Sequence, residues 1–326
     1  MIKYINPISG QELFPVKDGL QDKEGNLFPL EKGVYRLVSS ENYTANFGFQ
    51  WNTFKKAQID KFSGNNQSRK RFFGVTHWNN NDLTGQNILE VGSGAGRFSQ
   101  VVLDYTKANL YSLDYSNAVD ANYENNGHNE RLKIFQASVY EMPFANNSFD
   151  KVFCFGVLQH TPDFKKSVQC IIEKAKPGGE VVIDFYCIHG WWTKINAKYI
   201  LRPFLKHKSN EYLLDLITKN IDWMIWLHLF FAKLGLNKIL GRFVPIADIQ
   251  QFPKDIDTLQ MRELAILDTF DMFSPTYDNP QRLKTVGIWF EELGMVNVEA
   301  RLIKVDGNTI AVVKGYKELE YKRSYN

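Results

Sequence analysis

The stretch at residues 87–99, NILEVGSGAGRFS, most constrains what this chain can fold into. A short apolar run ends in three alternate glycines, Gly92, Gly94 and Gly96, and a helix-compatible run follows them. A nucleotide-type cofactor needs this order, because glycine lets the backbone approach a ligand closely and the next helix offers its N-terminal amides. The spacing G-x-G-x-G is neither that of dinucleotide binders nor that of phosphate loops.

An acidic residue ends the next predicted strand. Asp114 follows the run YSL and lies 18 residues after Gly96. A carboxylate at the tip of the second strand is placed to accept hydrogen bonds from ribose hydroxyls. The glycine turn and Asp114 therefore predict a nucleoside-binding site.

Short apolar runs alternate with helical segments through this region, which predicts a parallel sheet with helices on both faces. The predicted strands lie at 87–91, 110–114, 132–136, 151–155 and 180–185, with helices at 97–105, 118–126 and 164–175. Near the end of the chain we expect a helix at 282–293, where apolar residues recur at helical spacing, and two strands at 296–303 and 309–313.

Four motifs occur in order between about residues 84 and 184: ILEVGSGAGRFS, YSLDYS, MPFANNSFDKVFCFGVLQHTPD and KPGGEVVI. Together they resemble the class I S-adenosylmethionine-dependent methyltransferases, with a UbiE/type-11-like core. The resemblance implies an α/β fold, a Rossmann-like sheet of seven mostly parallel strands with helices on both faces. It also implies S-adenosyl-L-methionine as the cofactor and a transferase activity.

The resemblance further implies which residues hold the cofactor. Glu90 is expected under the methionine portion, Asp114 at the ribose and Tyr115 beside the adenine. Ser138 stands where the family often has a carboxylate that contacts the adenine amino group, and the backbone of Val139 is an alternative. The complete predicted cofactor set is Glu90, Gly92, Ser93, Gly94, Gly96, Asp114, Tyr115, Ser138, Val139 and Gly156.

His160 follows the tip of the fourth predicted strand, which abuts the methyl donor in the resembled family. An ordinary histidine pKa of about 6.5 suits proton removal near neutral pH, so His160 is the candidate base. The alternative is that it only orients the loop or caps the next helix. The run after this strand is not N/D-P-P-Y/F, which speaks against amino methylation of nucleic-acid bases.

About 90 residues, 188–280, lie between the fifth strand and the last helix. They are helical in pattern, and they follow a strand end where open α/β sheets bind ligands, so we interpret them as an acceptor-binding lid. A polar cluster within the lid supplies Asp268 and Asp271 as further catalytic candidates, although an N-cap and turn cluster explains it equally well. The predicted substrate-binding residues are Trp51, Gln159, Tyr186, His189 and Tyr277.

The window at 221–236, IDWMIWLHLFFAKLGL, is strongly apolar and has lysines on either side. It fits a buried lid helix, a homodimer contact or a helix at a membrane interface. We favour burial. Peripheral membrane contact and a homodimer stay open as partner predictions.

The first forty residues are rich in turns and resemble a zinc-ribbon-like leader. Asn6, Ser9, Gln21 and Glu24 stand where that pattern has paired cysteines, so we predict no metal. The predicted domains are therefore a small β-rich module at 1–40, helices and the cofactor core at 41–187, the lid at 188–280, and a last helix with a hairpin at 281–326.

The formal charge of +3 gives no strong nucleic-acid signal. Three scattered cysteines and the polar start of the chain predict a reduced, cytoplasmic location without a metal site. The predicted function is methyl transfer to a small-molecule acceptor, a sugar, glycolipid or other amphipathic metabolite, with oxygen as the favoured atom. This would suit polysaccharide or secondary-metabolite modification. The alternatives are a tRNA or protein methyltransferase and a non-catalytic cofactor-binding scaffold.

Overall fold

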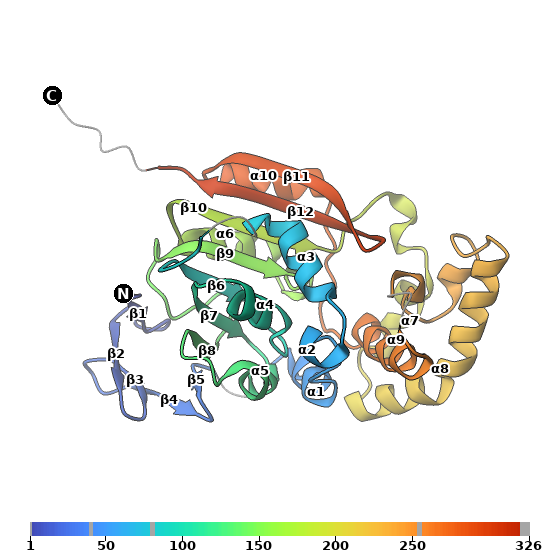
Figure 1. The fold of residues 1–326 in the computed structure, drawn as a ribbon, viewed down its shortest axis with the longest axis horizontal. Helices are drawn as coiled ribbons and strands as arrows, with labels where there is room; N and C mark the ends of the chain where they lie inside the picture. Colours follow the sequence, from blue (N-terminus) through green and yellow to red (C-terminus); the bar gives the residue numbers. More distant parts are fainter. Residues whose placement is uncertain (1, 39–41, 79–81, 253–255, 320–326) are drawn as a thin grey trace.

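The structure, a computed structural model, describes residues 2–38, 42–78, 82–252 and 256–319. The described residues form one sheet of 12 strands in the order β1-β2-β3-β4-β5-β8-β7-β6-β9-β10-β12-β11. Figure 1 shows this sheet at the centre, with a helical region at one end. The seven strands from β8 to β11 are those predicted, but the prediction of a seven-stranded sheet is wrong, because five N-terminal strands extend it.

The central strands run parallel and end in an antiparallel hairpin. β12 pairs antiparallel with both β10 and β11, whereas β8, β7, β6, β9 and β10 pair in parallel. Their bounds are β6 Asn87–Val91, β7 Asn109–Asp114, β8 Leu132–Gln136, β9 Phe149–Phe155, β10 Ala175–Phe185, β11 Met295–Val305 and β12 Asn308–Lys317.

The N-terminal strands are short: β1 Tyr4–Ile5, β2 Glu12–Val16, β3 Gly19–Gln21, β4 Leu27–Glu31 and β5 Val34–Arg36. β5 pairs in parallel with β8, which places Val34 opposite Ile134 and covers an edge that would otherwise be open. Tyr4 packs against Phe135 and Phe144, so these strands share the main hydrophobic core. The predicted boundary between residues 40 and 41 lies outside the described residues.

Polar contacts occupy the positions where a zinc ribbon has its cysteines. The Asn6 amide donates to Asp22 over 2.8 Å, and Gln11 donates to Glu24. Within the described ranges, no group of three or more His, Cys, Asp or Glu side chains could hold a metal ion.

Helices cover both faces of the sheet, as the near-continuous apolar strands require. Ile88 and Phe153 pack in one cluster with α3 (Gln67–Thr76) and α4 (Arg97–Tyr105), and α5 (Ala118–Asn126) lies next to α4. Leu89 and Cys154 point the other way, into a cluster with α6 (Phe164–Lys174) and α10 (Leu283–Glu292).

The insertion is helical, with α7 Ala197–Leu205, α8 Asn210–Lys233 and α9 Thr258–Phe273, and short 3-10 turns η3 Trp191–Lys194, η4 Gly241–Phe243 and η5 Ile249–Gln251. It has its own hydrophobic cluster. α9 packs against α1 (Ala45–Thr53), where the Phe49 and Phe270 rings lie 5.8 Å apart and Asn46 donates to Ser274. Figure 1 shows α7, α8 and α9 together beside one end of the central strands.

The favoured burial of the window at 221–236 is only half correct. Ile221, Met224 and Ile225 are buried against the insertion's own cluster, whereas Trp223 and Trp226 are 48% and 64% exposed. The window is apolar on both helix faces, and only one face meets α9. No helix among the described residues combines the length and apolarity needed to cross a bilayer.

Candidate functional site

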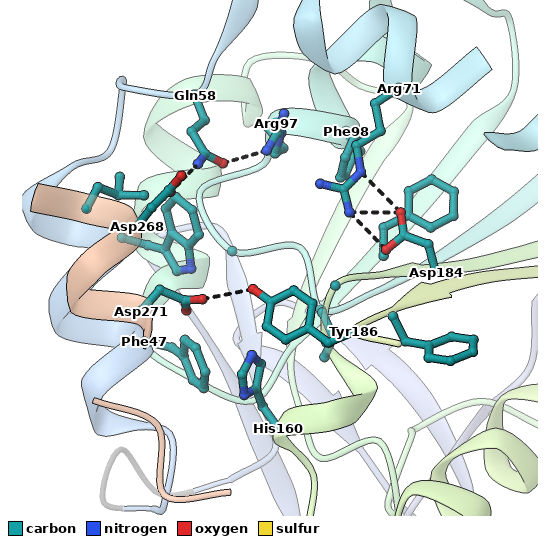
Figure 2. A pocket seen from close by; sticks show the side chains of 18 of the residues that line it. Phe47, Gln58, Arg71, Arg97, Phe98, His160, Asp184, Tyr186, Asp268 and Asp271 are labelled. Carbon is teal, nitrogen blue, oxygen red and sulfur yellow. Dashed lines mark hydrogen bonds and ion pairs between the residues drawn. The ribbon is translucent and has the colours of Figure 1, made fainter. Parts of the chain in front are cut away.

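A cavity of about 620 Å³ opens at the carboxyl ends of the central strands, between the sheet and helices α1 and α9. Its volume lies within the range typical of small-molecule sites. Thirteen predicted site residues line it (Figure 2 shows part of the wall): Trp51, Gly92, Ser93, Gly94, Asp114, Tyr115, Val139, Gly156, His160, Tyr186, His189, Asp268 and Asp271.

The glycine turn after β6 packs tightly on its surroundings. A Cβ on Gly92 would lie 2.3 Å from Val157 Cγ2, and one on Gly94 would lie 3.2 Å from the Trp51 indole nitrogen. Both glycines also have positive φ angles, 81° and 51°, which side chains disfavour. Glycine therefore lets the turn sit against the end of β9 and beneath α1. Gly96 lies behind the wall, facing Asn122 of α5.

Asp114 holds the glycine turn to the end of β7. One carboxylate oxygen accepts the Gly94 N–H over 2.8 Å, and the other accepts from the backbone and hydroxyl of Ser116. Burial raises the pKa of Asp114. The described residues place no cation within ion-pair distance of it. A carboxylate at the cavity wall without a cationic partner fits a ligand that donates hydroxyl hydrogen bonds, such as a ribose.

Glu90 lies beneath this turn rather than at the wall. Its side chain is buried and accepts from the hydroxyls of Ser99 and Ser112, the latter over 2.9 Å. Burial raises the pKa of Glu90 to about 7. Its Oε1 has no hydrogen-bond partner among the described residues.

His160 lines the cavity, and its two ring nitrogens have different surroundings. Nδ1 lies 3.0 Å from the backbone carbonyl of Tyr277, and because a carbonyl only accepts, this bond requires the proton on Nδ1. Nε2 is then the unprotonated acceptor, and it is buried without a hydrogen-bond partner in the described part of the chain. The ring lies 5.1 Å from Phe47 and 5.6 Å from Tyr186, perpendicular to the latter. Burial lowers the pKa of His160, which keeps the imidazole neutral at neutral pH.

Two carboxylates of α9 line the same cavity as His160. The Tyr186 hydroxyl donates to Asp271 Oδ2 over 3.1 Å. Asp268 lies one helical turn earlier and accepts from the Gln58 amide over 3.3 Å. Burial, together with the charge of Asp271, raises the pKa of Asp268 to about 7. Figure 2 shows both carboxylates on the same side of the cavity.

Two arginines complete the wall opposite His160. Arg97 donates to Gln58 Oε1 over 2.6 Å, so Gln58 bridges Arg97 and Asp268. Arg71 donates to both carboxylate oxygens of Asp184, over 2.8 and 2.9 Å. Burial lowers the pKa of Arg97 to about 10.

The sequence prediction missed Gln58, Arg97 and Asp184. Asp184 had a visible signal, a single acid within the apolar run VVIDF. Arg97 directly follows the glycine turn, so its position also pointed to the site. Nothing local marks Gln58.

Five residues predicted at the site do not line the cavity: Glu90 and Gly96, which lie behind the glycine turn, and Ser138, Gln159 and Tyr277. The Ser138 hydroxyl accepts from the Tyr140 backbone, and the buried Gln159 amide donates to the Gly156 carbonyl over 2.6 Å. The Tyr277 ring packs edge-on against Tyr43, so Tyr277 acts only through its carbonyl on His160. Ser138 and Gln159 thus bond within their own loops, and Tyr277 packs on a distant segment; residue spacing alone could not show these contacts.

The sequence profile of the family described as "Methyltransferase domain" matches residues 89–183, which carry the glycine turn, Asp114 and His160. This chain contains a class I S-adenosylmethionine-dependent methyltransferase domain. Its cofactor is S-adenosylmethionine, and the glycine turn, Asp114 and the adjoining cavity fit that molecule.

Among curated relatives, the methyltransferase domain is similar to phosphoethanolamine N-methyltransferase 2 of Caenorhabditis elegans, 34% identical over 107 residues, 31% of this chain and 24% of that protein. The tRNA U34 carboxymethyltransferase of Nautilia profundicola is 29% identical over 146 residues, 44% of this chain and 47% of that one. The chain thus matches less than half the length of either relative. Among solved structures, phosphoethanolamine N-methyltransferase 2 of Haemonchus contortus, with S-adenosylhomocysteine, superposes with a TM-score of 0.49 at 13% identity, over 86% of this chain and 60% of that one.

Proposed function

We propose that this protein transfers the methyl group of S-adenosylmethionine to a hydroxyl of a small amphipathic acceptor, such as a sugar or glycolipid, held in the cavity. The observation that carries this proposal concerns His160, which lines the cavity. Its buried Nε2 has no hydrogen-bond partner among the described residues, and the Tyr277 carbonyl fixes it as a proton acceptor. A hydroxyl acceptor must lose a proton during methyl transfer, and a neutral imidazole is suited to take it.

The cofactor, when bound, supplies an electrophilic methyl group on sulfur, and its leaving group departs neutral. The protein's task is to hold the acceptor in line and to exclude water. Gly92, Gly94 and Asp114 shape the cofactor side of the cavity. Phe47 and Tyr186 hold the His160 ring from two sides, so Nε2 keeps one orientation toward an acceptor hydroxyl.

The acceptor side combines aromatic and acidic groups. Trp51, Phe47 and Tyr186 offer ring faces, whereas Asp268 and Asp271 offer hydrogen-bond acceptors. Rings beside carboxylates suit a molecule with an apolar face and several hydroxyls. The same carboxylates would repel a polyphosphate chain, which weighs against the tRNA alternative.

A second candidate is an amine acceptor. The two carboxylates on α9 could attract an ammonium group, and Tyr186 could contribute its ring face. The relative from C. elegans is named as a phosphoethanolamine N-methyltransferase. In this case His160 would deprotonate the ammonium nitrogen instead of a hydroxyl.

The test is an acceptor panel with purified protein and S-adenosylmethionine, comprising nucleotide sugars, glycolipids, phosphoethanolamine and bulk tRNA. Release of S-adenosylhomocysteine reports turnover, and mass spectrometry with NMR locates the new methyl group. We expect an O-methylated sugar or glycolipid. An N-methylated product would favour the second candidate, and methylated tRNA would contradict both. Cofactor binding without turnover on any acceptor would support a non-catalytic scaffold.

A further inference from the structure

The outer face of α8 is apolar, and none of the described residues covers it. Trp223, Trp226, Phe230 and Leu234 recur at helical spacing and are between 45% and 64% exposed. The Trp226 and Phe230 rings stack 5.5 Å apart in this face. The opposite face of α8 packs on α9, and Figure 1 shows α8 at the outer edge of the molecule. Soluble proteins rarely leave several large apolar side chains together in water, so this face is expected to have a partner.

The turn after α8 continues the apolar surface. Ile239, Leu240 and Phe243 are each at least 40% exposed. The side chain of Arg242 donates to the carbonyl of Trp192 over 2.5 Å, which brings η3 beside this turn. Trp191, the neighbour of Trp192, is 79% exposed. We call the outer face of α8, this turn and the two tryptophans of η3 the apolar edge.

The segment that carries the apolar edge is rich in positively charged residues. Residues 191–243 contain nine lysines and arginines but three acidic residues, in a chain whose overall formal charge is +3. Lys208, Lys233 and Lys238 are exposed, and no carboxylate of the described residues lies within ion-pair distance of them. Lysine can lay its apolar stem along such a surface while its ammonium group reaches an anionic layer.

We propose that the apolar edge docks this protein on the surface of an anionic lipid bilayer, with α8 lying in the plane of the interface. Exposed tryptophan flanked by lysine is typical of segments at the boundary between head groups and acyl chains. A second copy of the chain fits this surface less well, because a symmetric contact would bring the lysines of both copies together. The proposal goes beyond methyl transfer and does not depend on it.

The test is flotation of the purified full-length chain with vesicles of phosphatidylcholine alone or with about one-third phosphatidylglycerol. The protein should float with the anionic vesicles and bind neutral ones far more weakly. Replacing Trp226 and Phe230 by serine should abolish flotation. The variant Lys233→Gln/Lys238→Gln, which keeps the apolar residues, should weaken binding about fivefold for each lysine removed.

Matched controls lie on other surfaces. Leu302→Ser, at a position of β11 that is 48% exposed, is the control for loss of apolar side chains. Lys23→Gln, at an exposed position, is the control for loss of positive charge. Both should float like the unmodified protein, and circular dichroism checks that all variants fold. Failure to bind anionic vesicles, or binding that survives both edge variants, would overturn the proposal. So would a dimer in light scattering that Trp226→Ser/Phe230→Ser dissociates, because a second copy would then cover the edge.

Discussion

The backbone carbonyl of Tyr277 fixes the imidazole of His160 with its proton on Nδ1, across a separation of 117 residues. The segment that follows α9 thereby sets the tautomer of a side chain placed by the end of β9. Nε2 is left as the only proton acceptor of the ring of His160, a residue that lines the cavity. The insertion and the methyltransferase core therefore build the proposed base jointly.

His160→Gln should reduce methyl transfer by about 10²-fold to 10⁴-fold, the usual contribution of a general base. The affinity for S-adenosylhomocysteine should stay unchanged, because the ring lies on the acceptor side. Turnover assays and calorimetric titration separate the two quantities. His128→Gln, at an exposed position, is the control and should leave both unchanged. Equal activity in the two variants would remove His160 from the mechanism.

The same histidine predicts the pH profile. Burial holds the pKa of His160 below the ordinary value of 6.5, so the ring stays neutral and able to accept a proton to below that pH. The rate should therefore fall only on the acidic side of pH 6.5 and be level above it. A plot of kcat/KM against pH measures this limb. A limb above pH 7 would contradict the assignment.

Gly92→Ala should destabilise the fold by about 1–3 kcal/mol, since its new Cβ would overlap Val157. Gly85→Ala is the matched control, because Gly85 also has a positive φ, 77°, but no atom of the described residues would lie within 4 Å of its Cβ. The loss of stability in Gly85→Ala should reflect backbone strain alone. Adding Val157→Ala to Gly92→Ala should recover part of the loss. Urea unfolding of the four proteins gives the comparison, and equal losses for the two glycine variants would show that packing plays no part.

Removal of Arg71 should cost about 3–5 kcal/mol of unfolding free energy, because Asp184 would remain buried without its partner. Asp184→Asn added to Arg71→Ala should restore much of the stability. The control is Lys165→Ala, which breaks an exposed pair with Glu292 and should cost no more than about 1 kcal/mol. A similar cost for both single variants would mean that burial of Asp184 is not decisive.

The stability of the protein should fall as pH rises through about 7. In the folded state the pKa of Glu90 is about 7, above its ordinary value of 4.5. Proton binding to Glu90 therefore stabilises the folded state; this stabilisation is fully present below pH 4.5 and is lost as pH rises through 7. Asp268, also raised to about 7, contributes in the same direction. Glu90→Gln should flatten part of this slope, whereas Glu124→Gln, on the exposed side of α5, should not. Urea unfolding at pH 5 and pH 8 measures the slope, and an unchanged slope in Glu90→Gln would contradict this reading.

Local patterns predicted much of the fold. The bounds of β6, β8, α4 and α5 agree with the structure to the residue, because each is a short element bounded by turn or capping residues. The pairing of β5 with β8 could not be predicted from the sequence, since Val34 and Ile134 are 100 residues apart and β5 spans only three residues. The apolar window in α8 likewise does not say which of its faces the rest of the chain covers.

The site residues likewise fall into two groups, those that a local motif predicts and those that only tertiary folding brings to the cavity. The glycine turn and Asp114 end two successive predicted strands, so the sequence predicted that they lie together at the cavity. Gln58 sits between α1 and α2 (Asp60–Ser63) and reaches Arg97 and Asp268 only through tertiary folding. Tyr277 was predicted for its side chain, but its contribution is a carbonyl, which every residue type carries.

The central claim is that the cavity beside Asp114 binds S-adenosylmethionine, and thermal unfolding with and without S-adenosylhomocysteine tests it most directly. At about 100 times Kd a ligand adds about 2.7 kcal/mol to the stability of the folded state, which raises Tm by a few degrees. We predict such a shift in the unmodified protein and its loss in Asp114→Ala, whose carboxylate no longer lines the cavity. No shift at millimolar ligand, or an equal shift in Asp114→Ala, would contradict the account.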